Sequence, residues 1–333
     1  MTSLPRQLRK VTDKALLRQL EAGLERVEVA LETAVSHTDP IAKVTARHLS
    51  SAGGKRVRPT LVLLTAQFGD NPTAEEIVDA SVVVELTHLA TLYHDDVMDN
   101  APMRRGVPSA HEIWGNSVAI LTGDLLFARA SQVVSKLGER ALTLQADTFE
   151  RLCLGQLHET VGPQEGDEPV AHYIQVLADK TGSLIAAAAE LGIMFSGADD
   201  NFRGPVREYG EKIGVAFQLI DDVIDLQSDS ATSGKTPGTD LLAGVPTLPT
   251  LYLGQMAQTD AAAAALVARI AAVTEETLAD VVRDLGAHEA TNRAYLEAKR
   301  WAADAVAALA PLPDSPAKQA MVAFAEAVVD RQN

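Results

Sequence analysis

Helical periodicity runs through almost the whole chain and constrains its fold more than any other feature. The segment KALLRQLEAGLERVEVALETAV, residues 14–35, repeats apolar residues every three or four positions and carries Glu and Arg on its other side. This spacing is typical of an amphipathic helix. Strand-like alternation is almost absent, and aromatic residues make up only 4% of the chain, so Ala, Val, Leu and Ile must build the core. We therefore expect an all-α protein.

Similar helical runs follow one another along the sequence. They span residues 59–69, 74–98, 116–137, 140–161, 168–195, 204–227, 246–274, 275–286, 290–309 and 315–331. Short clusters of Gly, Pro, Asn and Asp separate them. None of these breaks is long enough for an interdomain linker, so we expect residues 1–333 to form a single large helical domain.

Composition excludes several classes of protein. The chain has 45 acidic and 29 basic residues, a formal net charge of -16, which disfavours nucleic acid because that binding depends on cationic contacts to phosphates. An anionic ligand would need a local basic site or metal ions. Cys153 is the single cysteine, which fits a reducing cytoplasm, and we expect it to be a buried apolar residue. We also expect neither a signal peptide nor an integral membrane segment.

The stretch HDDVMDNAPMRRG contains the first cluster of chemical interest. In a helix, Asp95 and Asp99 lie on one face, with Asp96 beside them. Like charges at this spacing repel, so a cation should compensate them. Carboxylate oxygens are the ligands that Mg²⁺ prefers, often shared with substrate phosphates. Taken by itself, the cluster is equally well interpreted as a solvated acidic patch.

A second cluster in the same pattern favours the metal site. FQLIDDVIDLQSD places Asp221, Asp222 and Asp225 inside another apolar helical run. Two such clusters on two helices of a bundle would face a common cavity and hold several Mg²⁺ ions between them. If neither cluster bound a cation, the same unfavourable arrangement of like charges would have arisen twice by chance.

Basic residues in loops indicate what completes the coordination of these ions. They are Lys55, Arg56 and Arg58 in GGKRVRP, Arg104 and Arg105 after the first cluster, Lys180 in DKTGS and Lys235 in SGKTPGTD. GGKRVRP lacks the spacing of a nucleotide-binding phosphate loop, and no strand precedes it. Together with metal ions, these residues predict one diphosphate ligand or two. His88 is either a phosphate donor or a core residue, and nothing has the spacing of a zinc site or a Ser-His-Asp triad.

The chain resembles the trans-isoprenyl diphosphate synthases, or polyprenyl synthetases. GGKRVRP, ELTHLATLYHDDVMDNAPMRRG, GDLLFARA, GQLHE, DKTGSL, FQLIDDVIDLQSD and GKTPGTDLLAGVPTLP occur in the order of that family, over about residues 53–250. The resemblance implies a helical bundle of the isoprenoid synthase type around a central hydrophobic cavity, usually as a homodimer. It also implies that the chain condenses isopentenyl diphosphate with an allylic diphosphate primer, with Mg²⁺ as cofactor.

The resemblance assigns roles residue by residue. Asp95 and Asp99 would bind Mg²⁺ with Asp221 across the cavity, and Asp96, Asp222 and Asp225 would support that metal site. Isopentenyl diphosphate would contact Lys55, Arg58, His88 and Arg105. The allylic diphosphate would meet the metal ions together with Arg104, Lys180, Thr181, Gln218 and Lys235. Charge that develops on the departing diphosphate would be stabilised by Mg²⁺, arginine and lysine, and the released diphosphate would accept the proton, so no side-chain base is needed.

Product length should depend on the helical turns just before Asp95. In the family, the growing hydrocarbon runs beside this helix, and short-chain members often have an aromatic residue there. Thr87, Ala90 and Thr91 are all small. They predict a long-chain all-trans product, such as a quinone side chain, and replacing Ala90 with Phe is expected to shorten it.

Three alternatives remain at this point. A geranylgeranyl diphosphate synthase has the same motifs and a product of four isoprene units. A class I terpene cyclase would share the fold, but it typically pairs one aspartate motif with an Asn/Ser/Glu motif, and Asp221, Asp222 and Asp225 argue against it. A non-catalytic subunit that modulates an active partner is disfavoured by the intact motifs.

Overall fold

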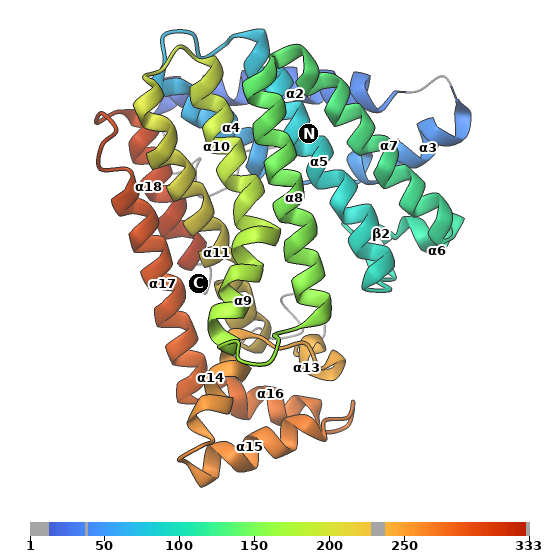
Figure 1. The fold of residues 1–333 in the computed structure, drawn as a ribbon, viewed down its shortest axis with the longest axis vertical. Coiled ribbons are helices and arrows are strands. Elements are labelled where there is room, and N and C mark those ends of the chain that lie inside the picture. Colours follow the sequence, from blue (N-terminus) through green and yellow to red (C-terminus); the bar gives the residue numbers. More distant parts are fainter. Residues whose placement is uncertain (1–12, 37–38, 228–236, 331–333) are drawn as a thin grey trace. The chain divides into compact units, whose positions relative to one another are not determined.

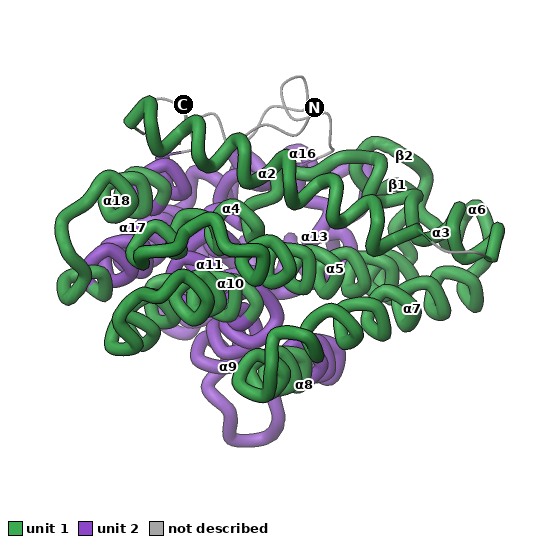
Figure 2. The backbone as a smooth tube through the Cα atoms, turned by 90° about the horizontal axis from the view of Figure 1, so that it is seen from above, with its two compact units in different colours: residues 1–150, 184–210, 308–324 green, residues 151–183, 211–307, 325–333 purple. Residues whose placement is uncertain are grey.

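The structure is a computed structural model that describes residues 13–36, 39–227 and 237–330. Helices dominate it (Figure 1), and within these residues the only strands are the two short ones of a hairpin. This confirms the all-α prediction. The chain divides into two compact units, coloured separately in Figure 2. Unit 1 comprises residues 1–150, 184–210 and 308–324, and unit 2 comprises residues 151–183, 211–307 and 325–333. The expectation of a single domain therefore stays a prediction.

Unit 1 contains the N-terminal helices and the hairpin. Its elements are α2 (Lys14–Val35), α3 (Pro40–Ser51), α4 (Val57–Thr65), η1 (Ala66–Phe68), α5 (Glu75–Met98), β1 (Met103–Arg104), β2 (Val107–Pro108), α6 (Ala110–Trp114), α7 (Asn116–Val134), η2 (Ser135–Leu137) and η4 (Asp200–Phe202). Helices α8 (Glu139–Val161), α10 (Ser183–Phe195), α11 (Arg203–Gln227), α17 (Glu289–Ala308) and α18 (Pro316–Val329) contribute residues to both units.

Unit 2 contains the remaining elements. They are α9 (Pro169–Leu177), η3 (Ala178–Gly182), α13 (Thr239–Ala243), α14 (Leu248–Met256), α15 (Ala261–Ala271) and α16 (Leu278–Gly286). The helix predicted over residues 246–274 is thus two helices, because Asp260 caps a new helix by accepting a hydrogen bond from the Ala262 amide. The helix predicted over residues 168–195 contains a π-helical turn, η3. The sequence analysis missed the short helices α3, α6 and α13.

Helix α5 is the core of unit 1. Its side chains from Ile77 to Ala90 are almost all buried, on every side of the helix, as expected for a helix that is covered all round. The neighbouring helix α7 approaches it closely, because a Cβ at Gly123 would collide with the imidazole of His94. The first aspartate cluster therefore lies at the end of a helix whose middle is buried on every side.

One helical stretch meets a simple test for a membrane span. Residues Asn116–Leu137 are long and apolar enough to cross a membrane, judged by length and composition alone. Of the most apolar part of this stretch, 39% is buried. The core helix of a soluble protein passes the same test, so the expectation that the chain has no integral membrane segment stays a prediction. Cys153, predicted to be buried, is exposed on α8, because it lies on the solvent side of that helix.

Candidate active site

The first aspartate cluster occupies the C-terminal end of α5. Asp99 is exposed at the C-cap, and its amide donates to the Asp95 carbonyl oxygen at 2.8 Å. Asp96 points into the protein, where its Oδ1 accepts a hydrogen bond from Arg104 Nε at 2.6 Å. Burial raises the pKa of the Asp96 carboxyl, and Arg104 opposes that change. Asp96 therefore anchors the segment that follows, and the exposed Asp99 lies at the end of the helix.

The hairpin positions Arg104 and Arg105, the two arginines of HDDVMDNAPMRRG. Arg104 is in β1, and Arg105 and Gly106 form the two-residue turn to β2, with φ values of 53° and 79°. Positive φ at both central residues is the geometry of a type I′ turn. The Arg105 side chain donates through Nη1 to the carbonyl oxygens of Leu49 and Gly53. Arg105 therefore holds the loop that precedes Lys55.

That loop leads into the N-terminus of α4. Lys55 is exposed and Arg58 lies in the first turn of the helix. Cations are unfavourable at a helix N-terminus, where the helix dipole and unpaired amides attract anions. Arg58 Nε is buried without a hydrogen-bond partner among the described residues, and burial lowers the pKa of Arg58 to about 10. These features indicate a site that is built to receive an anion.

His88 lies near the same arginines on α5. Its pKa is held well below the usual range, first by burial and then by the positive charge of Arg58 and Arg105. The imidazole is therefore neutral and has one N–H to donate. This supports the interpretation of His88 as a diphosphate donor.

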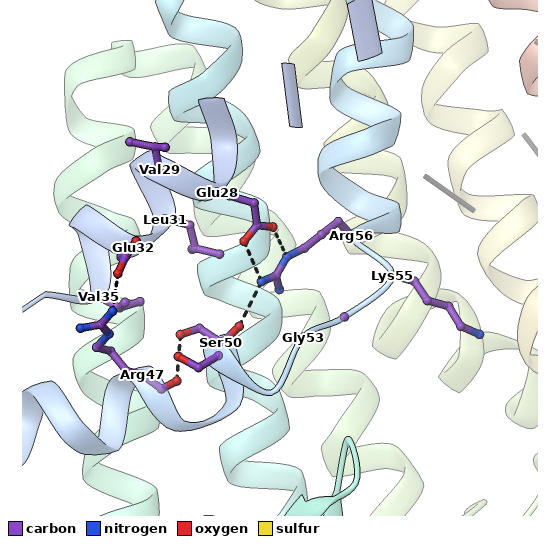
Figure 3. A pocket seen from close by; sticks show the side chains of 12 residues that line it. Glu28, Val29, Leu31, Glu32, Val35, Arg47, Ser50, Gly53, Lys55 and Arg56 are labelled. Carbon is purple, nitrogen blue, oxygen red and sulfur yellow. Dashed lines mark hydrogen bonds and ion pairs between the residues drawn. The ribbon is translucent and has the colours of Figure 1, made fainter. Parts of the chain in front are cut away.

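A pocket of about 510 Å³ borders Lys55 (Figure 3). Helices α2 and α3 and the loop before α4 form its walls, which include Glu28 and Glu32. These carboxylates would repel a diphosphate. Arg47 and Arg56 pair with them, and Lys55 points away from Arg56 in Figure 3. The diphosphate is therefore better placed by Arg58 and His88 than by this pocket.

The second aspartate cluster lies on α11 in unit 2. Gln218, Asp221, Asp222 and Asp225 are spaced so that they form one stripe on that helix. Asp222 Oδ2 accepts hydrogen bonds from the Tyr173 hydroxyl at 2.7 Å and from the Leu248 amide at 3.2 Å. Burial raises the pKa of Asp222 to about 7, and the Tyr173 hydrogen bond opposes that change.

Asp225 and Lys180 also have partners within unit 2. Asp225 Oδ2 accepts from the Gly238 amide at 2.9 Å, which ties down the end of the Gly-rich loop. Lys180 and Thr181 lie in η3, and Lys180 pairs with Glu159 of α8. Single π-helical turns are frequent at functional sites. Lys235, predicted to bind the allylic diphosphate, lies outside the described residues.

Tyr173, which contacts the second cluster, and two polar residues of α8 were not predicted from the sequence. Tyr173 and Glu159 were not proposed as site residues, although GQLHE contains Glu159. Gln156 of the same motif was also missed, and its Oε1 is buried without a hydrogen-bond partner among the described residues. The family motif could have indicated Glu159 and Gln156. No sequence signal indicated Tyr173, because its partner lies 49 positions away.

The residues that are present fit Mg²⁺. The donors are carboxylate oxygens at i and i+4 on each helix, the ligand type that Mg²⁺ favours. Within the described residues, no three Asp, Glu, His or Cys side chains form a complete site for an ion. Mg²⁺ usually keeps several waters and shares its coordination with substrate phosphates, so an incomplete set of protein ligands among the described residues is compatible with such an ion.

The turns before Asp95 line a narrow cavity in unit 1. Its volume is about 10 Å³, close to the space that one water needs. The lining residues are Val83, Val84, Thr87, Leu144, Gln145, Thr148, Leu184, Ala187 and Leu191. Of the three residues predicted to set product length, Thr87 lines this cavity, and the role of all three stays a prediction. Ala90 is fully buried but is not part of this lining, and Thr91 is half-buried.

Comparison with known proteins identifies the family. A family profile described as "Polyprenyl synthetase" matches residues 39–285. The chain is 42% identical over 319 residues to a nonaprenyl diphosphate synthase of Mycobacterium tuberculosis, covering 96% of this chain and 95% of the relative. The chain therefore belongs to the polyprenyl synthetase family. The predicted family and enzyme class, trans-prenyltransferase, are confirmed.

Solved structures show the same fold. A geranylgeranyl pyrophosphate synthase from Corynebacterium glutamicum, complexed with calcium and isoprenyl diphosphate, is 39% identical, with a TM-score of 0.84 over 96% of this chain and 98% of that chain. A decaprenyl diphosphate synthase from Rhodobacter capsulatus is 31% identical, with a TM-score of 0.85 over 96% and 99%. The predicted isoprenoid synthase type of fold is confirmed.

Proposed function

We propose that the protein is a Mg²⁺-dependent synthase that extends an allylic diphosphate primer with isopentenyl diphosphate to a long-chain all-trans polyprenyl diphosphate. The observation that carries the long-chain assignment is the small side chain of Thr87 in the cavity beneath the first aspartate cluster. The similarity to nonaprenyl and octaprenyl diphosphate synthases supports it. The similarity to the Corynebacterium glutamicum enzyme favours geranylgeranyl diphosphate as the second candidate product.

The proposed roles of the residues follow from their chemistry. Asp95, Asp99 and Asp221 would hold Mg²⁺, which would supply positive charge to the allylic diphosphate. Arg104, Lys180, Thr181, Gln218 and Lys235 would bind the same diphosphate, with Lys235 assigned from its motif. Lys55, Arg58, His88 and Arg105 would hold isopentenyl diphosphate.

Catalysis would be mainly electrostatic. When the allylic carbon–oxygen bond breaks, Arg104 and Lys180 would stabilise the negative charge on the departing diphosphate. The double bond of isopentenyl diphosphate then attacks the allylic cation, and the released diphosphate takes the proton. Apolar residues around Thr87 would exclude water from the cation.

The cavity beneath Asp95 must widen as the product grows. In the described structure it holds little more than one water, so a hydrocarbon has to displace side chains such as Leu144 and Gln145. Small residues on α5 make this displacement easier than an aromatic residue would. We therefore propose Thr87 as the main determinant of product length on α5, with Ala90 and Thr91 secondary.

Product analysis tests this proposal. Purified protein is incubated with Mg²⁺, labelled isopentenyl diphosphate and a farnesyl diphosphate primer, and the product is sized by chromatography. A product longer than four isoprene units is expected. A product of four units would refute the long-chain assignment and support the second candidate.

Two matched variants of α5 test the path of the chain. Thr87→Phe is expected to shorten the product by at least one isoprene unit, because the aromatic ring fills the cavity. Ala90→Phe places the same ring on a buried residue outside the lining, so it should shorten the product less. Unfolding in urea checks that overpacking, which typically costs about 1–3 kcal/mol, leaves both proteins folded. An unchanged product in Thr87→Phe would refute this path.

We also propose that the enzyme is a cytoplasmic homodimer. Ile113 of α6 and Ile120 and Leu121 of α7 are 46%, 42% and 65% exposed, and exposed apolar side chains on neighbouring helices are candidates for a protein interface. Sedimentation of the protein and of Leu121→Glu tests this. A monomeric wild-type protein at assay concentration would refute the homodimer.

A further inference from the structure

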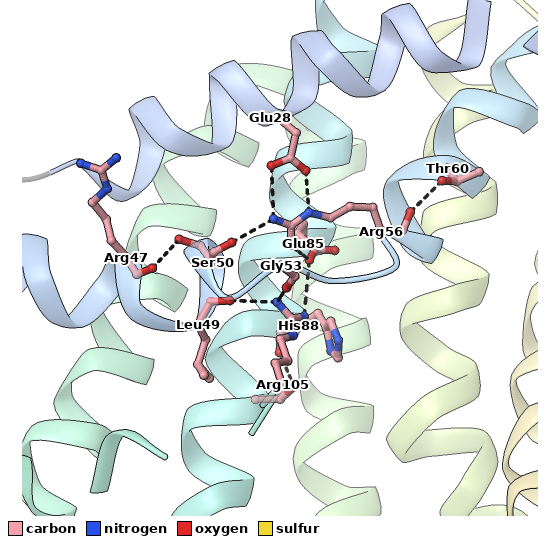
Figure 4. Close-up of polar contacts among 11 residues, drawn as sticks. Glu28, Arg47, Leu49, Ser50, Gly53, Arg56, Thr60, Glu85, His88 and Arg105 are labelled. Atoms are coloured by element: carbon pink, nitrogen blue, oxygen red, sulfur yellow. Dashed lines mark hydrogen bonds and ion pairs between the residues drawn. The ribbon is translucent and has the colours of Figure 1, made fainter. Parts of the chain in front are cut away.

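One buried carboxylate of unit 1, Glu85, lies against Arg56 and Arg105 (Figure 4). Arg56 Nη1 donates to Glu85 Oε1 at 2.6 Å, and both side chains are only 2% exposed. Arg105 Nη2 lies 3.8 Å from the same oxygen. Glu85 also attracts the buried guanidinium of Arg58. Glu85 therefore places one negative charge among the positive charges of three arginines.

The three arginines differ in their other partners. Arg56 has a second carboxylate, because its Nε donates to Glu28 Oε1 at 2.6 Å, and its Nη2 also donates to the Ser50 carbonyl oxygen. Burial would lower the pKa of Arg56, but Glu28 and Glu85 outweigh burial and raise it. Burial lowers the pKa of Arg58 and of Arg105, and Glu85 only partly offsets this. Arg56 therefore has two carboxylate partners, whereas among the described residues Arg58 Nε is buried without a hydrogen-bond partner and Arg105 donates to neutral carbonyl oxygens.

Arg105 connects Glu85 to the substrate-binding loop. Its guanidinium donates to the carbonyl oxygen of Gly53, and a Cβ added at Gly54 would lie 3.1 Å from that guanidinium. The loop backbone thus packs directly on the side chain that Glu85 holds. Arg56, which follows Lys55, is held by Glu85 from the other end of the loop.

We propose that Glu85 is a positioning residue for isopentenyl diphosphate, which fixes Arg56 and Arg105 so that the loop presents Lys55 and Arg58 to the diphosphate. Glu85 does not itself touch the substrate. This inference rests on the proposed function, since it assigns a supporting residue to the same diphosphate site.

Charge and positioning predict opposite effects when Glu85 is neutralised. Glu85→Gln makes the subsite more positive by one charge, which by Coulomb attraction alone would strengthen the binding of a diphosphate. Loss of the carboxylate also removes the charge-assisted hydrogen bond that Arg56 donates to Glu85 and the 3.8 Å ion pair of Arg105 with Glu85, which would weaken binding by misplacing the loop. The sign of the change in KM therefore distinguishes the two.

The experiment measures KM for isopentenyl diphosphate and for farnesyl diphosphate in wild type, Glu85→Gln, Glu85→Asp and Glu28→Gln. We expect Glu85→Gln to raise KM for isopentenyl diphosphate about tenfold, as loss of a hydrogen bond to a charged group would. KM for farnesyl diphosphate and kcat should change by less than about threefold. Glu85→Asp keeps the charge with a shorter side chain and should recover part of the loss.

Glu28→Gln is the matched control. It removes a carboxylate from Arg56, but among the described contacts Glu28 pairs with neither Arg58 nor Arg105. Arg56 keeps Glu85 and the Ser50 carbonyl oxygen in this variant, so KM for isopentenyl diphosphate should rise clearly less than in Glu85→Gln, by about threefold at most. Circular dichroism and thermal unfolding show that each variant is folded.

Three results would overturn the role of Glu85. They are an unchanged or lowered KM for isopentenyl diphosphate in Glu85→Gln, an equal rise of both KM values, and an equal effect of Glu28→Gln. If Glu85→Gln does not fold, Glu85→Asp decides, because an unchanged KM for isopentenyl diphosphate in that variant also refutes the role. A wild-type protein that consumes no isopentenyl diphosphate would refute the proposed function and this inference together, whereas an active wild type separates them.

Discussion

The two aspartate clusters have the same DDxxD spacing but hold their middle carboxylates in different ways. Asp96 of unit 1 is paired with a cation, since Arg104 Nε donates to it at 2.6 Å. Asp222 of unit 2 accepts from two neutral donors, the Tyr173 hydroxyl and the Leu248 amide. In both clusters the middle aspartate is occupied by protein groups. The repeated motif therefore contains an inner aspartate held by the protein, and the chemistry of its partner differs between the units.

The first prediction removes an outer carboxylate from each cluster. Asp95→Ala and Asp221→Ala should each reduce kcat/KM by about 10³-fold or more, because the charge that stabilises the leaving diphosphate is lost. Turnover assays with Mg²⁺ measure this, and circular dichroism should show unchanged helicity. Asp147→Ala, on the exposed side of α8, is the control. Wild-type rates in either cluster variant would contradict the metal assignment.

The second prediction separates the two inner carboxylates. Asp96→Asn should lower the free energy of unfolding by about 2–3 kcal/mol, because it removes a buried charge partner of Arg104 and places an amide where Asp96 Oδ2 is already without a hydrogen bond. Asp222→Asn should lower it by about 1 kcal/mol, since Asn still accepts from Tyr173. Urea unfolding without Mg²⁺ measures both. Equal losses of unfolding free energy in the two variants would show that a charged partner and neutral partners stabilise the buried aspartate equally.

The third prediction concerns the neutral donor of unit 2. Tyr173→Phe should reduce kcat/KM about tenfold, because Asp222 keeps the Leu248 amide but loses the hydroxyl that orients it. Tyr209→Phe is a matched control, since the Tyr209 hydroxyl donates to the Met321 carbonyl oxygen at 2.8 Å, in unit 1. It should lose stability but keep its activity. If both variants keep full activity, Tyr173 does not support the cluster.

The fourth prediction has the smallest expected effect and concerns how His88 makes the stability of the protein depend on pH. The pKa of His88 is held well below 6.5 in the folded protein by burial and by Arg58, so below pH 6.5 the unfolded chain binds a proton that the folded protein does not. Stability is therefore lost as the pH falls. Between pH 7.5 and 5.5, wild type should lose about 1 kcal/mol more than His88→Gln. Parallel urea titrations measure the difference, and equal losses would contradict it.

Long periodic segments were predictable from the sequence. Residues 14–35 form α2 as expected, and the segment predicted over 74–98 is α5, which begins at Glu75. Both segments have a strong apolar periodicity, which is a local property of the sequence. The break after Met256 was not predicted, because Ala-rich sequence continues the helical pattern and the capping by Asp260 is a single local event.

The outer site residues were predictable and their supports were not. Asp95 and Asp221 follow from a motif whose spacing has a direct chemical meaning. Glu85 appears as one polar residue in an apolar run, and only the fold shows that it meets Arg56, which is 29 positions away. Arg56 itself was read as one of several loop cations, whereas its buried side chain points into the protein. Partnerships of this kind depend on tertiary packing, which a local pattern does not encode.

The close approach of α7 to α5 at Gly123 has a consequence for how this chain can vary over evolution. The space next to Gly123 is filled by the imidazole of His94, the residue immediately before the first aspartate cluster. The two positions therefore share one volume. A relative with a larger residue at 123 should carry a smaller one at 94, and a substitution at either position should be tolerated better when the other changes with it.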